Sequence, residues 1–455
     1  MERSRHRVRK IAIQVGIFLA LVALLEGSSR LLERINPRQE FKQHLGLQPY
    51  MMFAGGPRRG AIWEDILKNK KVPSTLEFNN YGFPELFDYK LIPDADYLHR
   101  NGKKPGERIV LITGGSVVYG TGATSNETTI SARLMHHLNK KSNGTRYRVL
   151  NMAMGSWIAY QQFIALSLFG LPFDPDWIVV MDGHNDGAVP CIHGSGPGNP
   201  MFWPQVLSLT YGGSGQAEAN STIAKLARHS ALVRLISGLR PDEKPKGPSG
   251  LVVDVTDPDG RFPVKMAGVT IADQDRQVAF YLQAQRNVLA LFKQANVLLS
   301  TQPLYRDNVL VPSYRAAFAA GGTAFKSVEA ELDHYMAEKG AISCERHANW
   351  ADPLSHNPPL AYFMARSALR LIDFVDEAQK ADSSRHIIYK NVEGALPYDT
   401  KLRERFFIDN AHLSDLGQDR VAEFFADIVL ASERGTPFDF AAFAKRSAEL
   451  AAANR

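Results

Sequence analysis

Cysteine is scarce in this chain of 455 residues, which contains only Cys191 and Cys344. So few cysteines exclude a disulfide scaffold and a zinc module built on several thiolates. In an exported domain the two thiols could pair, but sequence spacing does not give their separation, so two free thiols remain an alternative. The sequence also lacks any repeat of about 20–50 residues, which excludes solenoids and propellers.

Beyond the first ten residues the chain has almost no surplus of positive charge. The formal net charge is +6, but residues 1–10 carry five basic groups and one glutamate, which leaves +2 for the other 445 residues. A domain that binds phosphate backbones carries a stronger basic patch. We therefore expect no nucleic-acid partner.

The basic start precedes an apolar run over residues 11–25, IAIQVGIFLALVALL. A positive flank before an apolar run is typical of a signal anchor or a cleaved signal peptide. The run is shorter than the about 20 residues of a full span, but Leu31 and Leu32 can extend it. Because no small-x-small cleavage site follows, we predict an uncleaved transmembrane helix within residues 1–35, with the residues beyond it exported.

Short apolar runs alternate with helical patterns in the rest of the chain, which indicates an α/β fold with a parallel sheet and helices on both faces. The expected strands are residues 108–113, 147–152, 177–181, 297–301 and 386–389. The expected helices include residues 130–138, 158–169 and 275–294. We predict one domain over residues 36–455.

Two stretches interrupt this rhythm, at about residues 187–265 and 305–383, and we predict that both are insertions above the sheet. They contain aromatic side chains that could stack on sugar rings, although packing in the core or in a lid is the simpler reading. These side chains are Phe202, Trp203, Tyr211 and Trp350.

Three of the expected strands end in polar or small residues. Gly114-Gly115-Ser116 follows the first strand, and such a turn can expose a nucleophilic hydroxyl at the carboxyl edge of a sheet. Gly155 follows the second strand and Asn185 the third, where a backbone N–H and a side-chain amide can stabilise an oxyanion. Taken singly, each signal is more often an ordinary turn.

A fourth signal, Asp409-Asn410-Ala411-His412, lies near the C-terminus. An imidazole that acts as a general base needs an acceptor to fix its tautomer, and a carboxylate three residues earlier can supply it. A metal site is a weaker reading, because two ligands without a third nearby specify little.

The order of the four signals resembles the SGNH branch of the GDSL hydrolase family. Its blocks match Gly114-Gly115-Ser116 with Gly120, then Gly155, then Gly183-His184-Asn185-Asp186, then Asp409 with His412. The resemblance spans roughly residues 108–430 without the insertions. It implies a flavodoxin-like fold with a five-stranded parallel sheet.

The resemblance also implies roles for these residues. Ser116 would be the nucleophile, His412 its base, and Asp409 the residue that orients His412. The oxyanion hole would combine the N–H groups of Ser116 and Gly155 with the amide of Asn185. No cofactor and no metal are implied.

One position departs from the family pattern, because Gly115 replaces the aspartate of the usual Gly-Asp-Ser block. Such variants look like those of exported bacterial enzymes that act on O-acetyl groups of polysaccharides or cell walls. We expect a serine ester hydrolase that works through an acyl-enzyme, with an acylated carbohydrate as substrate.

Two alternatives stay open. An O-acyltransferase acting on an exported polysaccharide or cell-wall glycan would use the same machinery, and the membrane anchor would place it beside a membrane-embedded partner. A catalytically silent carbohydrate-binding component of an export complex would not need an intact set of Ser116, Asp409 and His412. For each, we expect a single-pass protein of a bacterial inner membrane with its large domain on the periplasmic side.

Overall fold

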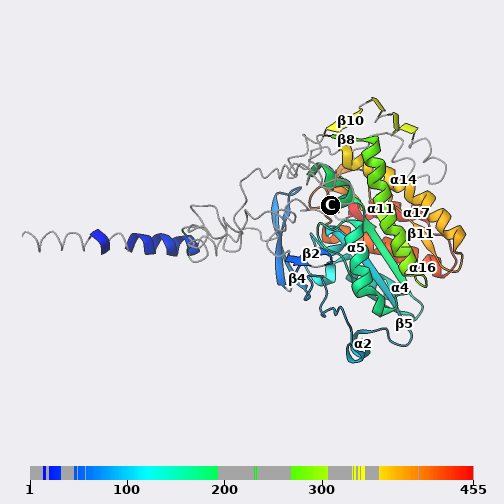
Figure 1. Cartoon of the computed structure of the whole chain (residues 1–455), viewed down its shortest axis with the longest axis horizontal. Helices are drawn as coiled ribbons and strands as arrows, with labels where there is room; N and C mark the ends of the chain where they lie inside the picture. Colours follow the sequence, from blue (N-terminus) through cyan, green and yellow to red (C-terminus); the bar gives the residue numbers. More distant parts are fainter. Residues whose placement is uncertain are drawn as a thin grey trace, which may run out of the picture. The chain divides into compact units, whose positions relative to one another are not determined.

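The structure is a computed structural model, shown in Figure 1. It describes residues 14–16, 20–31, 46–48, 50–56, 58–192, 230, 232, 268–305, 330–331, 333–334, 337–338, 340–343, 358–397 and 399–453. The chain divides into two compact units, residues 1–44 with 204–256, and residues 45–203 with 257–455.

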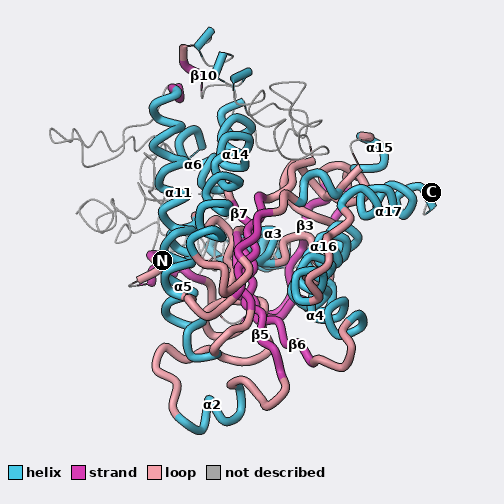
Figure 2. Tube along the Cα trace, turned by 90° about the vertical axis from the view of Figure 1, so that its right-hand side faces the viewer, coloured by secondary structure: helices cyan, strands magenta, loops and turns pink. Residues whose placement is uncertain are grey.

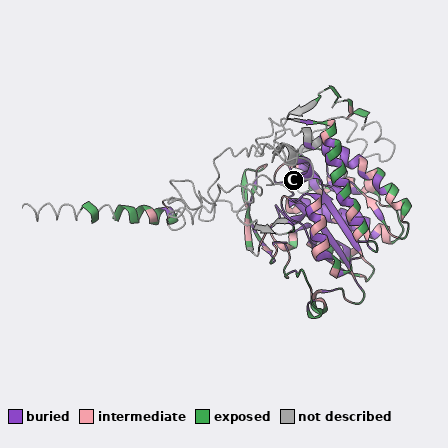
Figure 3. Cartoon of the chain, in the orientation of Figure 1, coloured by how far each residue is buried: buried purple, intermediate pink, exposed green. Residues whose placement is uncertain are grey.

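In the first unit, one helix is long and apolar enough to cross a membrane. The candidate span covers Gln14–Leu31, with a mean hydropathy of 1.4 and 7% of its residues buried. Figure 3 shows the exposed surface of this helix. A signal sequence would have the same properties, so the helix is compatible both with the expected anchor and with a cleaved signal peptide.

The second unit is built on a five-stranded sheet in which all strands are parallel. From edge to edge the order is β11-β9-β7-β5-β6. The strands are β5 (Glu107–Gly114), β6 (Arg146–Asn151), β7 (Trp177–Asp182), β9 (Asn296–Thr301) and β11 (Ile387–Tyr389). Counted along the chain, this is the 2-1-3-4-5 order of flavodoxin-like folds, and it confirms the predicted fold class.

The apolar runs form strands because the sheet is covered on both faces. Every residue of the central strand β7 is buried. One face carries α4 (Ile130–Lys141) and α16 (Asp415–Glu433), while the other carries α5 (Ala159–Ala165), α11 (Ile271–Leu291) and α14 (Pro358–Ala381), as Figure 2 shows. The helix expected over residues 158–169 ends its α-helical part at Ala165 and continues as a π-turn over Leu166–Gly170.

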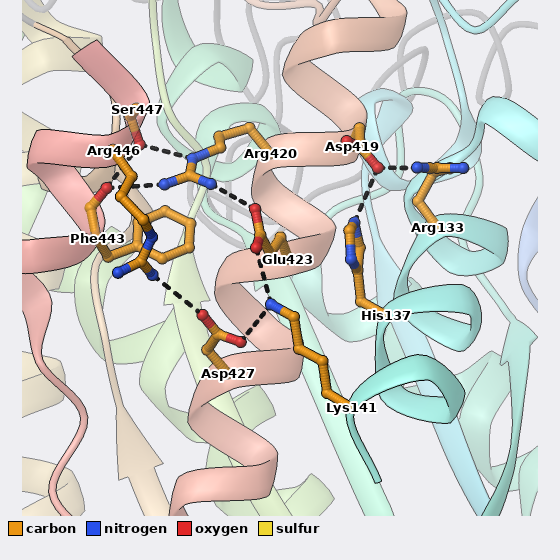
Figure 4. A network of polar contacts seen from close by, with 10 residues as sticks. All are labelled: Arg133, His137, Lys141, Asp419, Arg420, Glu423, Asp427, Phe443, Arg446 and Ser447. Carbon is orange, nitrogen blue, oxygen red and sulfur yellow. Dashed lines mark hydrogen bonds and ion pairs between the residues drawn. The ribbon is translucent and has the colours of Figure 1, made fainter. Parts of the chain in front are cut away.

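Charged side chains join the two helices of the first face to the C-terminal helix α17 (Phe440–Ala453). Asp419 of α16 pairs with Arg133 and His137 of α4, and Lys141 of α4 pairs with Glu423 and Asp427 of α16. Figure 4 shows that the network continues through Arg420 to Ser447 and Phe443 of α17. Helices α4 and α16 therefore present complementary charges, and Arg446 of α17 also pairs with Asp427 of α16.

The second expected insertion is shorter than predicted. Helix α14 lies inside residues 305–383, yet it packs on β9 and β11 and connects these parallel strands. It is the crossover helix that any parallel pair needs, and it belongs to the core rather than above the sheet. A strand just beyond the first interruption, β8 (Gly268–Thr270), pairs antiparallel with a strand inside the second, β10 (Ala341–Ser343).

An antiparallel hairpin precedes the first core strand and was not predicted. It consists of β3 (Arg58–Asp65) and β4 (Lys70–Phe78). Both strands belong to the second unit, and in the chain they precede α2 (Ala95–Asn101). The remaining elements are β1 (Gly46–Gln48), β2 (Met52–Ala54), α3 (Ser116–Tyr119), α6 (His184–Ile192), α15 (Thr400–Arg403) and the 3₁₀ turns Asn126–Thr128, Leu171–Phe173 and Val392–Ala395.

Candidate active site

Ser116 lies at the carboxyl edge of the sheet, where β5 gives way to the single helical turn α3. The turn is tight, because a Cβ atom on Gly114 would lie 2.3 Å from the carbonyl oxygen of Met181 on β7. Gly120 ends α3 with a φ of 97°, a conformation that favours glycine. The glycines of the first block therefore have a structural reason, because they allow the chain to turn tightly on both sides of Ser116.

The structure brings Ser116, His412 and Asp409 into one chain of hydrogen bonds. Nε2 of His412 lies 2.7 Å from Oγ of Ser116, and Nδ1 of His412 lies 2.7 Å from Oδ2 of Asp409. If Nδ1 carries the proton, it donates to the carboxylate, and Nε2 is left to accept the proton of the serine hydroxyl. The serine and the histidine are 296 residues apart in the sequence.

Asp409 is arranged to stay ionised. Its carboxylate accepts hydrogen bonds from the backbone N–H groups of Ala411 (2.8 Å) and His412 (2.7 Å). Burial by itself raises the pKa of Asp409, but the charge of His412 and these hydrogen bonds outweigh it, so that the pKa lies below its ordinary value. An ionised acceptor holds the imidazole in the orientation that serves Ser116.

Contacts from the start of α16 tie the loop that carries His412 to the segment that follows Ser116. Asp415, one residue beyond the cap of α16, accepts from the backbone N–H (2.9 Å) and the hydroxyl (2.6 Å) of Thr124. Gly122 approaches the loop so closely that a Cβ atom there would lie 2.1 Å from the carbonyl oxygen of Leu413. Ser414 caps α16, and its side chain accepts from the backbone N–H of Gly417.

Asn185 lies against the turn that carries Ser116. Its Nδ2 donates to the carbonyl oxygen of Trp157 (2.8 Å) and lies 2.7 Å from the point where a Cβ atom on Gly115 would be. Gly155 is buried in the turn between β6 and α5, where the N–H of the preceding residue, Met154, faces the carbonyl oxygen of Gly114 at 3.4 Å. Both expected oxyanion donors therefore border the strand end that presents Ser116.

Two further polar residues stand at this edge, and sequence reasoning gave them no role. His184 is buried beside Asn185, and burial, followed by the charge of His412, lowers its pKa to about 4. Gln302 directly follows β9, and its Nε2 donates to the carbonyl oxygen of Ala411 (3.2 Å) in the loop between Asp409 and His412. Its position after the fourth parallel strand is the signal that could have identified Gln302.

Part of what was predicted lies outside the described residues. The structure describes neither Cys344 nor the side chain of Cys191, and it does not describe the four aromatic residues of the insertions. Among the residues that it does describe, no group of three or more histidine, cysteine, aspartate or glutamate side chains could hold a metal ion. That the protein needs no metal or cofactor stays a prediction.

Comparisons with known proteins find only distant similarity. No family model matches the sequence, and no curated protein matches it. An acetyl xylan esterase is 12% identical, with 70% of this chain and 98% of its own chain covered and a TM-score of 0.28. A provisionally assigned acylhydrolase from Bacteroides fragilis is 11% identical, with 75% and 99% covered and a TM-score of 0.33.

An acetylxylan esterase from Geobacillus stearothermophilus is 13% identical, with 58% of this chain and 93% of its own chain covered and a TM-score of 0.24. TM-scores this low do not establish a common fold. The function is therefore inferred from the geometry of the site itself.

Proposed function

We propose that this chain is a serine ester hydrolase that acts through a covalent acyl-enzyme. The observation that carries the proposal is the continuous chain from Ser116 to His412 to Asp409, with both hydrogen bonds at 2.7 Å. A hydroxyl, an imidazole and an ionised carboxylate in this order form an activated nucleophile.

In the first half of the reaction, Oγ of Ser116 attacks the ester carbonyl carbon while Nε2 of His412 takes the hydroxyl proton. The carbonyl oxygen becomes an oxyanion, which the N–H groups of Ser116 and Gly155 and the Nδ2 of Asn185 stabilise. The imidazolium then gives its proton to the departing alcohol oxygen, the C–O bond to that oxygen breaks, and the acyl group stays on Ser116.

In the second half, His412 takes a proton from water, and the resulting nucleophile attacks the acyl carbon. The tetrahedral intermediate collapses, Ser116 recovers its proton from His412, and the carboxylic acid leaves. Asp409 keeps the same hydrogen bond to Nδ1 of His412 throughout, and its charge stabilises the imidazolium that forms twice in each cycle.

We further propose that the enzyme belongs to the SGNH branch of the GDSL hydrolases and that its substrate is an O-acetylated carbohydrate outside the inner membrane. Four sequence blocks in the family order support the first part. The Gly-Gly-Ser form of the first block supports the O-acetylated substrate, and the basic start and the candidate span over Gln14–Leu31 support a location outside the inner membrane. A reporter enzyme that is active only outside the cytoplasm, fused after Arg455, would test the orientation, and an inactive fusion would overturn it.

The test of the activity is ester turnover by the detergent-solubilised chain with p-nitrophenyl acetate and p-nitrophenyl butyrate. Ser116→Ala should lower kcat by several powers of ten. Ser432→Ala is the matched control, because among the described residues Oγ of Ser432 bonds only the carbonyl oxygen of Ile428 within α16 (2.8 Å). Turnover that survives Ser116→Ala unchanged would contradict the proposal.

Two other outcomes would replace the hydrolase by its alternatives. Serine-dependent release that stays slow until an oligosaccharide acceptor is added would identify an acyltransferase. A chain that releases no ester and does not react with a fluorophosphonate probe at Ser116 would favour a silent carbohydrate-binding component.

A further inference from the structure

Asp186 is the last residue of the Gly183–Asp186 block, and the proposed mechanism does not use it. It is buried at the first turn of α6, next to Asn185. Its carboxylate oxygens lie 3.3 and 3.2 Å from the backbone nitrogen of Ala159, which begins α5. A side chain of one element thus holds the backbone of another beside the proposed oxyanion hole.

Asn185 makes a second bond to the same stretch of chain, because its Nδ2 donates to the carbonyl oxygen of Trp157 (2.8 Å). Two consecutive residues of α6 therefore hold the backbone on either side of Ile158. The segment before it is the turn that carries the N–H of Gly155. The two bonds fix this turn relative to the amide of Asn185, which is the other donor of the proposed hole.

The turn needs such support. Ser156 has a φ of 68°, a left-handed conformation that costs energy for any residue except glycine. Within the turn, the N–H of Trp157 reaches the carbonyl oxygen of Met154 only at 3.4 Å. A strained turn closed by a long hydrogen bond persists when surrounding groups hold it. Asp186 and Asn185 supply those groups from outside the turn.

We propose that Asp186 is a positioning residue that sets the direction of the Gly155 N–H through its bond to Ala159. The inference rests on the proposed function, in which that N–H stabilises the oxyanion. Asp186 is itself held in place, because Nε2 of Gln277 on α11 donates to its backbone carbonyl oxygen.

The chemistry of the carboxyl group suits this role. Burial, followed by the nearby charge of Asp182, raises the pKa of Asp186 well above its ordinary value. A carboxyl group held neutral still accepts from the N–H of Ala159, but it places no full negative charge beside a developing oxyanion.

The test compares Asp186→Ala, Asp186→Asn and Asp176→Ala in the full chain. Asp176 is the matched control. Its carboxylate also accepts from a backbone N–H, that of Ile109 (2.7 Å), but at the amino-terminal ends of the strands, away from Ser116. Asp186→Ala should lower kcat on p-nitrophenyl acetate by about 10- to 100-fold, less than the loss of a whole oxyanion donor, with KM changed by less than about 2-fold.

Asp186→Asn should recover most of that loss, because its amide oxygen can accept from Ala159. Asp176→Ala should lower the melting temperature without lowering kcat. If Asp186→Ala lowers kcat no more than Asp176→Ala does, or if Asp186→Asn fails to recover activity, the positioning role is wrong.

Amide hydrogen exchange over residues 153–159 separates this inference from the proposed function. Exchange in this segment should be faster in Asp186→Ala than in Asp176→Ala, whether or not the protein turns over an ester. A wild-type chain without Ser116-dependent turnover would overturn the proposed function, and exchange would then decide the positioning role alone. Unchanged exchange would overturn the positioning role even in an active enzyme.

Discussion

Nδ2 of Asn185 occupies the space that a side chain on Gly115 would need, with 2.7 Å between that nitrogen and the Cβ position. Asn185 cannot swing away freely, because the same nitrogen is bound to the carbonyl oxygen of Trp157. A side chain in place of Gly115 would therefore have to displace the amide of Asn185.

From this contact we predict that Gly115→Asp, which introduces the residue usual in the family that the sequence resembles, strongly lowers ester turnover. A side chain at this position would displace the Asn185 amide, and the loss of one oxyanion donor lowers kcat by about 100- to 1,000-fold. Gly115→Ala should have a smaller effect in the same direction. Steady-state kinetics on p-nitrophenyl acetate measure both.

Gly56→Ala provides the control for this pair, because a Cβ atom at Gly56 would meet nothing within 4 Å. It should leave kcat unchanged. An active Gly115→Asp protein would contradict the prediction, because the amide of Asn185 would then either have kept its place or not be needed for turnover.

Asp182, at the end of β7, should make the stability of the fold depend on pH. Burial raises its pKa to about 7, although Tyr281 and Gln285 donate hydrogen bonds to its carboxylate. A raised pKa favours the neutral form in the folded state, so its contribution is complete below about pH 4 and is lost as the pH rises through about 7. The melting temperature should fall over this range.

Asp182→Asn should remove this part of the pH dependence. The amide oxygen of the new asparagine can accept from the hydroxyl of Tyr281. If the side-chain amide of Gln285 rotates by half a turn, its Oε1 can accept from the N–H of the new asparagine. Oε1 of Gln285 has no other partner among the described residues. Melting curves of wild type and variant at several pH values test this. Equal slopes for the two proteins would show that Asp182 ionises normally.

Asp419 should act in the opposite direction. Burial opposes its ionisation, but His137 and Arg133 on α4 outweigh burial and lower its pKa to about 2 (Figure 4). The ionised form is favoured in the folded state, so the stability it contributes is present above about pH 4 and is lost as the pH falls through about 2.

Asp419→Asn should therefore destabilise the protein at neutral pH by about 1 kcal/mol, since the pair is partly exposed to solvent. Denaturant unfolding at pH 7 measures this change. The matched comparison is Asp415→Asn on the same helix, which should lower kcat by loosening the contact with Thr124. Asp419→Asn should leave kcat unchanged, and an equal loss of kcat in both variants would contradict this division of roles.

The β3–β4 hairpin should matter for turnover although it contributes no reacting group. Nζ of Lys68 at its tip donates to the carbonyl oxygens of Glu404 and Phe407, both at 3.0 Å, in the segment that leads to Asp409. Lys68→Met should lower kcat by about 10-fold, because small displacements of reacting groups are costly. Lys71→Met, an exposed position on the same hairpin, should have no effect.

The core of the fold and the candidate residues Ser116, His412 and Asp409 could be predicted because each carries a local signal in the sequence. An apolar run that Ser116, Gly155 or Asn185 follows within a few residues indicates a buried strand and also the small or polar residue at its carboxyl end. All five predicted strands form, and their order follows the predicted topology.

The parts that sequence reasoning missed depend on contacts between distant residues. Asp186 and Gln302 look like ordinary residues of a turn until Ala159 and Ala411 are seen opposite them. Helix α14 was assigned to an insertion because it follows an irregular stretch, and only its packing on β9 and β11 identifies it as a crossover. The hairpin has adjacent charged residues, Arg58-Arg59 and Lys70-Lys71, and a proline at position 73, which break the alternation that marks a strand.

The 296 residues between Ser116 and His412 also have a consequence in time. A ribosome adds about 5–20 residues per second, so that the serine exists for roughly 15 to 60 seconds before its base has been made. During that interval the growing chain cannot cleave an ester, whatever compartment it is in. If the chain is exported while it is being made, its chemistry begins only after the nucleophile has left the cytoplasm, and the esters of the cell's own metabolism are never exposed to it.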